Sequence, residues 1–167
     1  MLKLDMIRHR FDDSEVDYRI PLKQAIQRSL PATDNMSPVW NFDSPTEKKL
    51  ITYDGLFLVK KPDKTTQEMI HLIERKRCFQ LTDFRTGLAF VKRHGKQLED
   101  WLREGNTPFS RAMGIVILQR FSDGHRWCHP LIYKAEDQDH FECRSHRIIP
   151  KFTWNPEYYF LVQETNH

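Results

Sequence analysis

The sequence has few cysteines, no long apolar run and no glycine-rich segment. Only three cysteines, Cys78, Cys128 and Cys143, occur in 167 residues, and this odd number at wide spacing does not make a disulfide framework and fits a reducing compartment. The longest apolar runs, such as 114–118, are far below the ~20 residues that a membrane span requires. Residues 1–5 include a lysine and an aspartate where an apolar leader would run. We therefore expect an intracellular protein with no signal peptide and no membrane contact.

Glycine-dependent sites and repeats are also missing from the sequence. The six glycines are isolated from one another, which excludes a glycine-rich phosphate loop. There is no internal repeat and no Gly/Ser linker, and the length favours a single globular domain over 1–167. Hydrophobic residues make up 39% and aromatic residues 12% of the chain, which excludes a disordered protein.

Local patterns predict three helices. Pro21 at a first helical position and Pro31 after the last predict a helix over 21–30. A Thr-x-x-Glu capping box from Thr65 to Glu68 predicts a helix over 66–78. The longest helix is predicted over 84–104, because apolar residues recur there at spacings of about three or four. These residues are Phe84, Leu88, Val91, Leu98 and Leu102.

The remaining apolar runs have the character of strands. Alternation predicts a first strand over 2–7, and Asp54-Gly55 between 50–53 and 56–59 predicts a β-hairpin with a two-residue turn. Four further strands are expected over 113–121, 125–134, 140–149 and 158–163. We expect these four to form an antiparallel meander. Strands grouped after helices indicate an α+β fold, with the helices packed on one face of the sheet.

Positive charge is concentrated in the middle of the chain. The formal net charge is +3, but residues 46–111 hold fourteen basic and nine acidic groups, whereas the two flanking segments are each slightly acidic. At 100° per residue, four basic side chains of the 84–104 helix fall on one stripe beside its apolar face, namely Arg85, Lys92, Lys96 and Arg103. A basic stripe of this kind can follow a phosphate backbone, and it can equally be a solvated helix face.

We therefore predict a DNA- or RNA-contacting protein, more consistent with a binding protein than with an enzyme. The predicted nucleic-acid contacts are Arg75, Arg77, Arg85, Lys92, Arg93, Lys96 and Arg103. The alternative partner is an acidic protein surface, which would make the chain an inhibitor or adaptor that binds through the same basic face.

Three residues suggest a catalytic alternative. Asp54, Glu74 and Lys76 stand in the order Asp, then Glu-x-Lys, which resembles the D…ExK superfamily of metal-dependent nucleases. The resemblance implies that the two carboxylates hold Mg²⁺ or Mn²⁺ while the lysine orients water. Those enzymes place an aspartate shortly after Glu-Arg-Lys, whereas this chain continues with 77–80, which contains none.

Local structure gives the same three residues another interpretation. Asp54 is explained as a turn residue, and a helix would separate Glu74 from Lys76 by about 200°. Only a strand would place Glu74 and Lys76 on one face. The nuclease alternative therefore requires residues 69–77 to form a strand.

Histidines and cysteines near the C-terminus form a possible zinc pattern. The zinc candidates are Cys128, His129, Cys143 and His146, which have the residue types of a zinc site. A hairpin that pairs Lys134 with His140 places Cys128 opposite His146, but it puts the two other histidines of the pattern, His125 and His140, at opposite ends of the ladder. We therefore expect small buried cysteines, no zinc and no resident cofactor.

Overall fold

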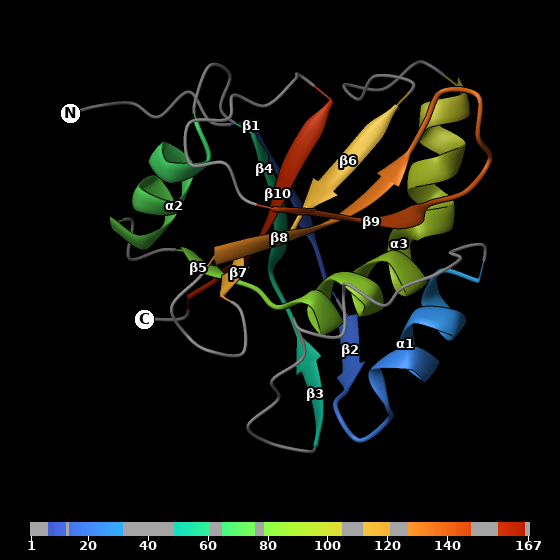
Figure 1. Ribbon diagram of the computed structural model, residues 1–167, viewed down its shortest axis with the longest axis horizontal. Helices are drawn as coiled ribbons and strands as arrows, with labels where there is room; N and C mark the ends of the chain where they lie inside the picture. The colour runs from blue at the N-terminus through green and yellow to red at the C-terminus, as the bar shows by residue number, and fades with distance from the viewer. Residues whose placement is uncertain are drawn as a thin grey trace.

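The computed structural model describes residues 7–12, 14–31, 49–60, 65–75, 79–104, 112–120, 127–147 and 157–165 (Figure 1). The helices are α1 (Leu22–Ser29), α2 (Thr66–Arg75) and α3 (Phe84–Glu104). The strands are β1 (Ile7–Phe11), β2 (Ser14–Asp17), β3 (Leu50–Tyr53), β4 (Leu56–Lys60), β5 (Phe79–Leu81), β6 (Met113–Val116), β7 (Gln119–Arg120), β8 (Trp127–Lys134), β9 (Glu142–Arg147) and β10 (Tyr158–Glu164). Three helices with a mostly antiparallel sheet confirm the predicted α+β fold.

Eight strands of the described residues form the main sheet, and their order corrects part of the predicted meander. Strands follow the order β1-β4-β10-β6-β8-β7, while β5 pairs with β10 and β9 pairs with β8. β6, β8 and β9 form antiparallel neighbours as expected. β10 instead lies between β4 and β6 and runs parallel to β6. Residues 159–162 of β10 are all buried, which is typical of a central strand covered on both faces.

Helices cover both faces of this sheet, so the prediction that they share one face is wrong. Leu161 of β10 packs in one apolar cluster with Leu98 of α3 and with α1. Phe160, the neighbouring residue of β10, packs in a second cluster with Met69 of α2. Successive strand side chains point to opposite faces, so α1 and α3 lie on one face and α2 lies on the other (Figure 1).

The predicted hairpin of residues 50–53 and 56–59 does not form, because the two strands have different partners. β3 pairs with β2, whereas β4 pairs with β1 and β10. Gly55 between β3 and β4 has a φ of 68°, in the left-handed region that favours glycine. The Gly55 amide donates to Asp12 Oδ1 at 3.2 Å. Asp12 lies between β1 and β2, so this hydrogen bond joins the two points at which the paired strands are interrupted.

The small β2–β3 sheet continues the β1–β4 ladder. Phe11 pairs with Leu56, and three residues further along Ser14 pairs with Tyr53, so both ladders keep one register. No strand was predicted for the acidic segment around β2, which lies between the predicted strand 2–7 and the predicted helix 21–30. Ser14 and Val16 are buried while Glu15 is exposed, and this alternation makes the acidic segment a strand with one solvated face.

Pro130 accounts for the division of the predicted strand 113–121 into β6 and β7. Ile117 donates its amide to the Pro130 carbonyl at 3.0 Å, but proline has no amide with which to return a bond. Pairing with β8 resumes at Gln119, which lies opposite Cys128. The dipeptide Asp123-Gly124, which has the residue types of a hairpin turn, lies outside the described residues.

Helix α2 begins with the predicted capping box. Thr65 Oγ1 accepts the Glu68 amide at 3.2 Å, and Glu68 Oε2 accepts the Thr65 amide at 2.7 Å. The helix ends at Arg75 in the structure, and residues 76–78 of the predicted helix lie outside the described part of the chain.

We expect the substitution Thr65→Ala to lower the free energy of unfolding by about 1 kcal/mol, because the Glu68 amide loses its capping acceptor. Urea unfolding of both proteins measures this difference. Thr52→Ala is the matched control, since Thr52 is an exposed threonine outside the capping box. An equal effect of the two substitutions would contradict a stabilising cap.

None of the helices in the described ranges is both long and apolar enough to cross a membrane.

Candidate nucleic-acid interface

The solvent face of α3 carries the basic residues that the sequence predicted for it, with one exception. Lys92, Arg93 and Lys96 are exposed. Arg103 is also exposed, and its Nη1 lies 3.6 Å from Asp100 Oδ1. This ion pair offsets positive charge at the end of the helix. Lys92, Arg93 and Lys96 remain as exposed cations on two successive turns of α3.

Arg85 is the exception, because it is buried rather than exposed. Only 6% of its surface is accessible, and its Nη1 donates to the Ile20 carbonyl. The first turns of α3 are covered by β2 and α1, which both contact this helix. Helical spacing identifies the stripe on which Arg85 lies, but it contains no information about which elements cover that stripe.

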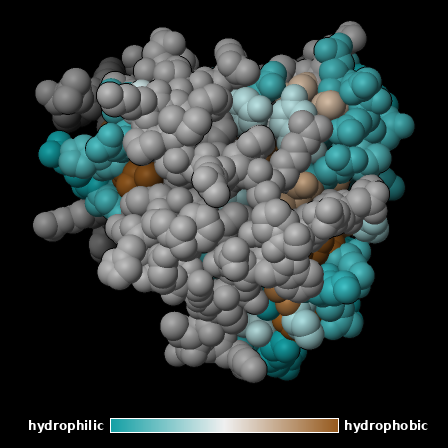
Figure 2. Space-filling view, in the orientation of Figure 1, coloured by the Kyte–Doolittle hydropathy of each residue, from teal (hydrophilic) through white to brown (hydrophobic). Residues whose placement is uncertain are grey.

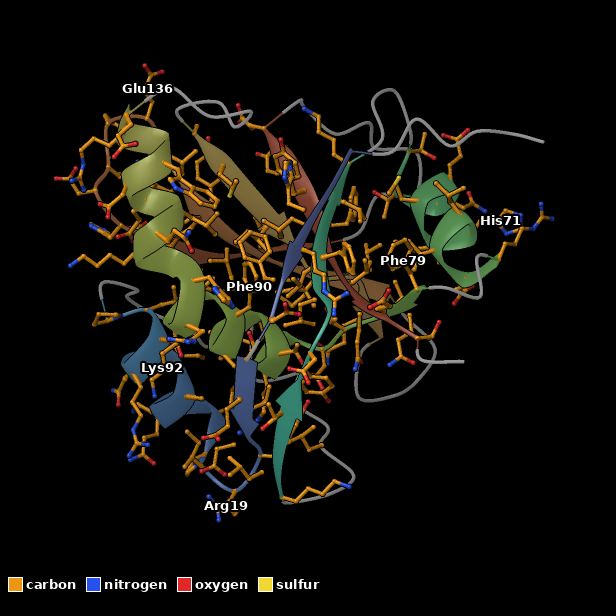
Figure 3. The ribbon with its side chains drawn as sticks, turned by 180° about the vertical axis from the view of Figure 1, so that it is seen from behind. Arg19, His71, Phe79, Phe90, Lys92 and Glu136 are labelled. Carbon is orange, nitrogen blue, oxygen red and sulfur yellow. The ribbon has the colours of Figure 1, made fainter. Side chains whose placement is uncertain are left out.

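Hydrophilic side chains gather over α3 and α1 at one edge of the molecule (Figure 2). At the junction of α1, β2 and α3 there is a cavity of about 230 Å³. Its charged lining residues are Glu15, Asp17, Arg28, Arg85 and Lys92. Lys92 lies where α1 meets α3 (Figure 3), so it belongs both to this cavity and to the exposed row on α3.

The carboxylate of Asp17 is already engaged at one side of the cavity. Arg19 donates Nε to Asp17 Oδ1 at 2.8 Å and Nη2 to Asp17 Oδ2 at 3.0 Å. These hydrogen bonds, with the Arg19 backbone amide and the charge of Arg28, lower the pKa of Asp17 to about 2. Asp17 is therefore ionised at neutral pH and hydrogen-bonded to Arg19. Arg28 lines the same cavity.

Of the two remaining predicted nucleic-acid contacts, Arg75 does not lie on this surface. Arg75 is exposed at the end of α2, and α2 packs on the face of the sheet opposite α3. Arg77 lies outside the described residues. The structure therefore separates Arg75 from Lys92 and Lys96, and these residues do not form one continuous basic face.

The strand required by the nuclease alternative is not formed between residues 69 and 75. This segment is part of α2, and Glu74 is exposed on it. Asp54 is exposed between β3 and β4. The pKa of Arg10 is raised mainly by its hydrogen bond to Asp12 and by the charge of Asp12, while the charges of Glu164 and Asp54 contribute least. Lys76 lies outside the described residues, so its position relative to Glu74 stays a prediction.

The zinc candidates have a pairing register different from the predicted one. His129, not Cys128, lies opposite His146, and Cys128 lies opposite Arg147. Cys143 pairs with Ile132 further along the ladder, and burial raises the pKa of its thiol to about 12. The loop is one residue longer than the predicted pairing assumed. Within the part of the chain that the structure describes, no three His, Cys, Asp or Glu residues are grouped to hold a metal ion.

Sequence reasoning missed Arg28 as a neighbour of the α3 row. Its local signal was limited to a basic residue in the last turn of a short amphipathic helix, which fits the helix dipole without any ligand. The packing of α1 against α3 places Arg28 in the same cavity wall as Lys92, and that proximity depends on the tertiary fold.

Comparison of the chain with protein-family models, with curated proteins and with solved structures finds no match.

Proposed function

We propose that this chain binds the phosphate backbone of DNA or RNA through the exposed face of α3. The observation that carries the proposal is the row formed by Lys92, Arg93 and Lys96, which are exposed on one rigid helix. Val91, Leu98 and Leu102 of the same helix are buried, so the opposite side of α3 is anchored in the core. The charges are therefore presented from a fixed support, which reduces the entropy lost when a polyanion binds.

The exposed row is shorter than the stripe predicted from the sequence. With Arg85 buried, it begins at Lys92, and the rise to Arg103 is about 16 Å at 1.5 Å per residue. Asp100 offsets Arg103 at one end. Binding of generic nucleic acid is accordingly expected to be moderate and strongly dependent on salt, because each neutralised phosphate releases condensed counterions.

Reversing the charge of Lys92 and Lys96 together tests this proposal. We expect Lys92→Glu with Lys96→Glu to weaken binding to a generic duplex by tenfold or more, and to reduce the slope of log affinity against log salt by about 2. The measurement is fluorescence anisotropy at about 50 and 200 mM salt, the range in which phosphate contacts lose most affinity.

The matched control is Lys23→Glu with Arg75→Glu. Both residues are exposed on other helices, and both double variants take the formal net charge from +3 to −1. An equal loss in the two variants would show that net charge rather than the α3 face governs binding. Signals from wild type and the α3 variant that are equal and independent of salt would overturn the proposal and favour an acidic protein partner.

A further inference from the structure

We infer that the cavity between α1, β2 and α3 binds a terminal phosphate monoester, so that the protein recognises the end of a nucleic-acid strand. This inference deepens the proposed function and rests on it for the identity of the bound strand. The cavity itself is defined by its position, size and lining residues, and these can be tested separately from the exposed face of α3.

The walls of the cavity come from three elements that meet at the edge of the molecule. Arg28 is contributed by α1, Glu15 and Asp17 by β2, and Arg85 and Lys92 by α3. Its volume of about 230 Å³ lies below the ~300–1,000 Å³ of sites that enclose a whole drug-sized ligand. A site of this size fits a charged group at the end of a larger molecule better than it fits a complete cofactor.

Three cationic side chains line this small space. Arg85 is nearly fully buried and is fixed by the bond from its Nη1 to the Ile20 carbonyl. Arg28 and Lys92 are exposed and line the same cavity from two different helices. Guanidinium groups match the geometry of phosphate oxygens, and an ammonium group adds a point charge.

Two carboxylates, Glu15 and Asp17, also line the cavity beside its three cations. Both oxygens of Asp17 accept hydrogen bonds from Arg19, a fourth cation that does not line the cavity, and the charge of Arg28 acts on the same carboxylate. Glu15 is exposed to solvent, as are Arg28 and Lys92, so water screens these three charges alike. Among these residues the four cations outnumber the two carboxylates, and this excess of positive charge suits a dianion.

A monoester fits this arrangement better than a phosphodiester does. A terminal phosphate carries about −1.5 to −2 charges at pH 7, whereas each backbone phosphodiester carries only one. A concave site walled by three elements admits a strand end, while a continuous backbone can lie along the exposed face of α3. Lys92 belongs to both surfaces, and so a strand that follows α3 toward its first turns reaches the cavity there.

The test compares three oligonucleotides of one sequence, with a 5′-phosphate, a 3′-phosphate or hydroxyls at both ends. We expect one phosphorylated form to bind about tenfold more tightly than the hydroxyl form, as one additional charged contact of ~1.4 kcal/mol would give. A nucleoside monophosphate and inorganic phosphate serve as competitors. Competition by either one, at millimolar concentration, would show that the shared monoester chemistry is recognised without the rest of the strand.

Two variants locate the preference in the cavity. Ala89 lines the cavity between Arg85 and Lys92 on α3, and Ala89→Met fills space there without changing any charge. We expect this variant to lose the preference for a phosphorylated end while binding the hydroxyl oligonucleotide with unchanged affinity and salt dependence. Arg28→Gln should also lose the preference. Thermal unfolding of each variant confirms that the fold is retained.

The outcomes separate this inference from the proposed function. Equal affinity for phosphorylated and hydroxyl ends overturns the inference while leaving binding by the α3 face intact. A preference that survives in Ala89→Met overturns its assignment to the cavity. If no oligonucleotide binds, but calorimetry detects a nucleoside monophosphate that Ala89→Met excludes, the proposed function fails and the monoester site stands. Absence of every kind of binding overturns both.

Discussion

Replacing Leu98 with alanine is expected to lower the free energy of unfolding by about 2 to 5 kcal/mol. Leu98 is fully buried in α3, and it belongs to the apolar cluster that joins α3 and α1 to the inner strands of the sheet. The substitution removes apolar surface from the core and leaves a cavity that the surrounding elements fill only in part. Chemical denaturation of wild type and variant measures the change.

Leu50→Ala is the matched control for this experiment, because it makes the same chemical change at an exposed position. Leu50 of β3 is 44% exposed, so we expect its replacement to change the free energy of unfolding by less than about 0.5 kcal/mol. A loss below about 1 kcal/mol for Leu98→Ala would contradict the packing of α3 against the sheet.

Helix α3 could be predicted from the sequence because its signals are local. Apolar residues at helical spacing identify the buried face, and Leu88, Val91, Leu98 and Leu102 are all buried as predicted. The capping box at Thr65 is likewise a pattern of four consecutive residues, and its two bonds form as expected. Residues close in sequence determine these features, so a single sequence is sufficient to find them.

Strand pairing could not be predicted in the same way, because it depends on residues far apart in the chain. Asp54-Gly55 has the residue types of a hairpin turn, and Gly55 does have a positive φ. The chain nevertheless passes there from one sheet to the other, since β4 gains β1 and β10 as neighbours. The apolar run of β10 indicates a strand but contains no signal for its place between β4 and β6.

The candidate site was predictable only where a helix face is exposed. Lys92, Arg93 and Lys96 were expected to face solvent, and they do. Arg85 lies on the same helical stripe but meets Ile20 and is buried. A helical wheel places side chains around an axis, whereas the covering of Arg85 and the cavity shared with Arg28 arise from the packing of α1 and β2 on α3.

The start of α3 is joined to the small β2–β3 sheet by a partly buried group of polar side chains. Asp83 Oδ2 accepts the Tyr18 hydroxyl at 2.7 Å, and Asp83 Oδ1 accepts the Thr86 amide at 2.8 Å. The Tyr53 hydroxyl lies 3.1 Å from that of Tyr18. Burial, followed by the charge of Asp83, raises the pKa of Tyr18, so this hydroxyl stays protonated and donates to the carboxylate at neutral pH. One side chain thus both caps α3 and fixes the chain that follows β2.

We expect Asp83→Ala to lower the free energy of unfolding by about 2 to 4 kcal/mol, because it combines two losses. The Thr86 amide loses its cap, which costs about 0.5 to 2 kcal/mol, and the buried Tyr18 hydroxyl loses its acceptor, which costs about 1 to 3 kcal/mol. Urea unfolding is measured for Asp83→Ala and for Thr65→Ala. Thr65→Ala removes only a helix cap at an exposed site, so the additional loss of stability in Asp83→Ala measures the contribution of the Tyr18 hydroxyl.

Two further variants apportion the effect of Asp83. Asp83→Asn keeps an oxygen for the Thr86 amide and should lose only part of the stability. Tyr18→Phe removes the hydroxyl, so Asp83→Ala in that background should cost little more than an ordinary cap. If Asp83 and Tyr18 acted independently, the changes in free energy of unfolding of the two single variants would add up to that of the double variant. That result would contradict a shared role. Their coupling is expected because one carboxylate accepts hydrogen bonds from both segments, which makes the first turn of α3 and the turn after β2 depend on the same residue.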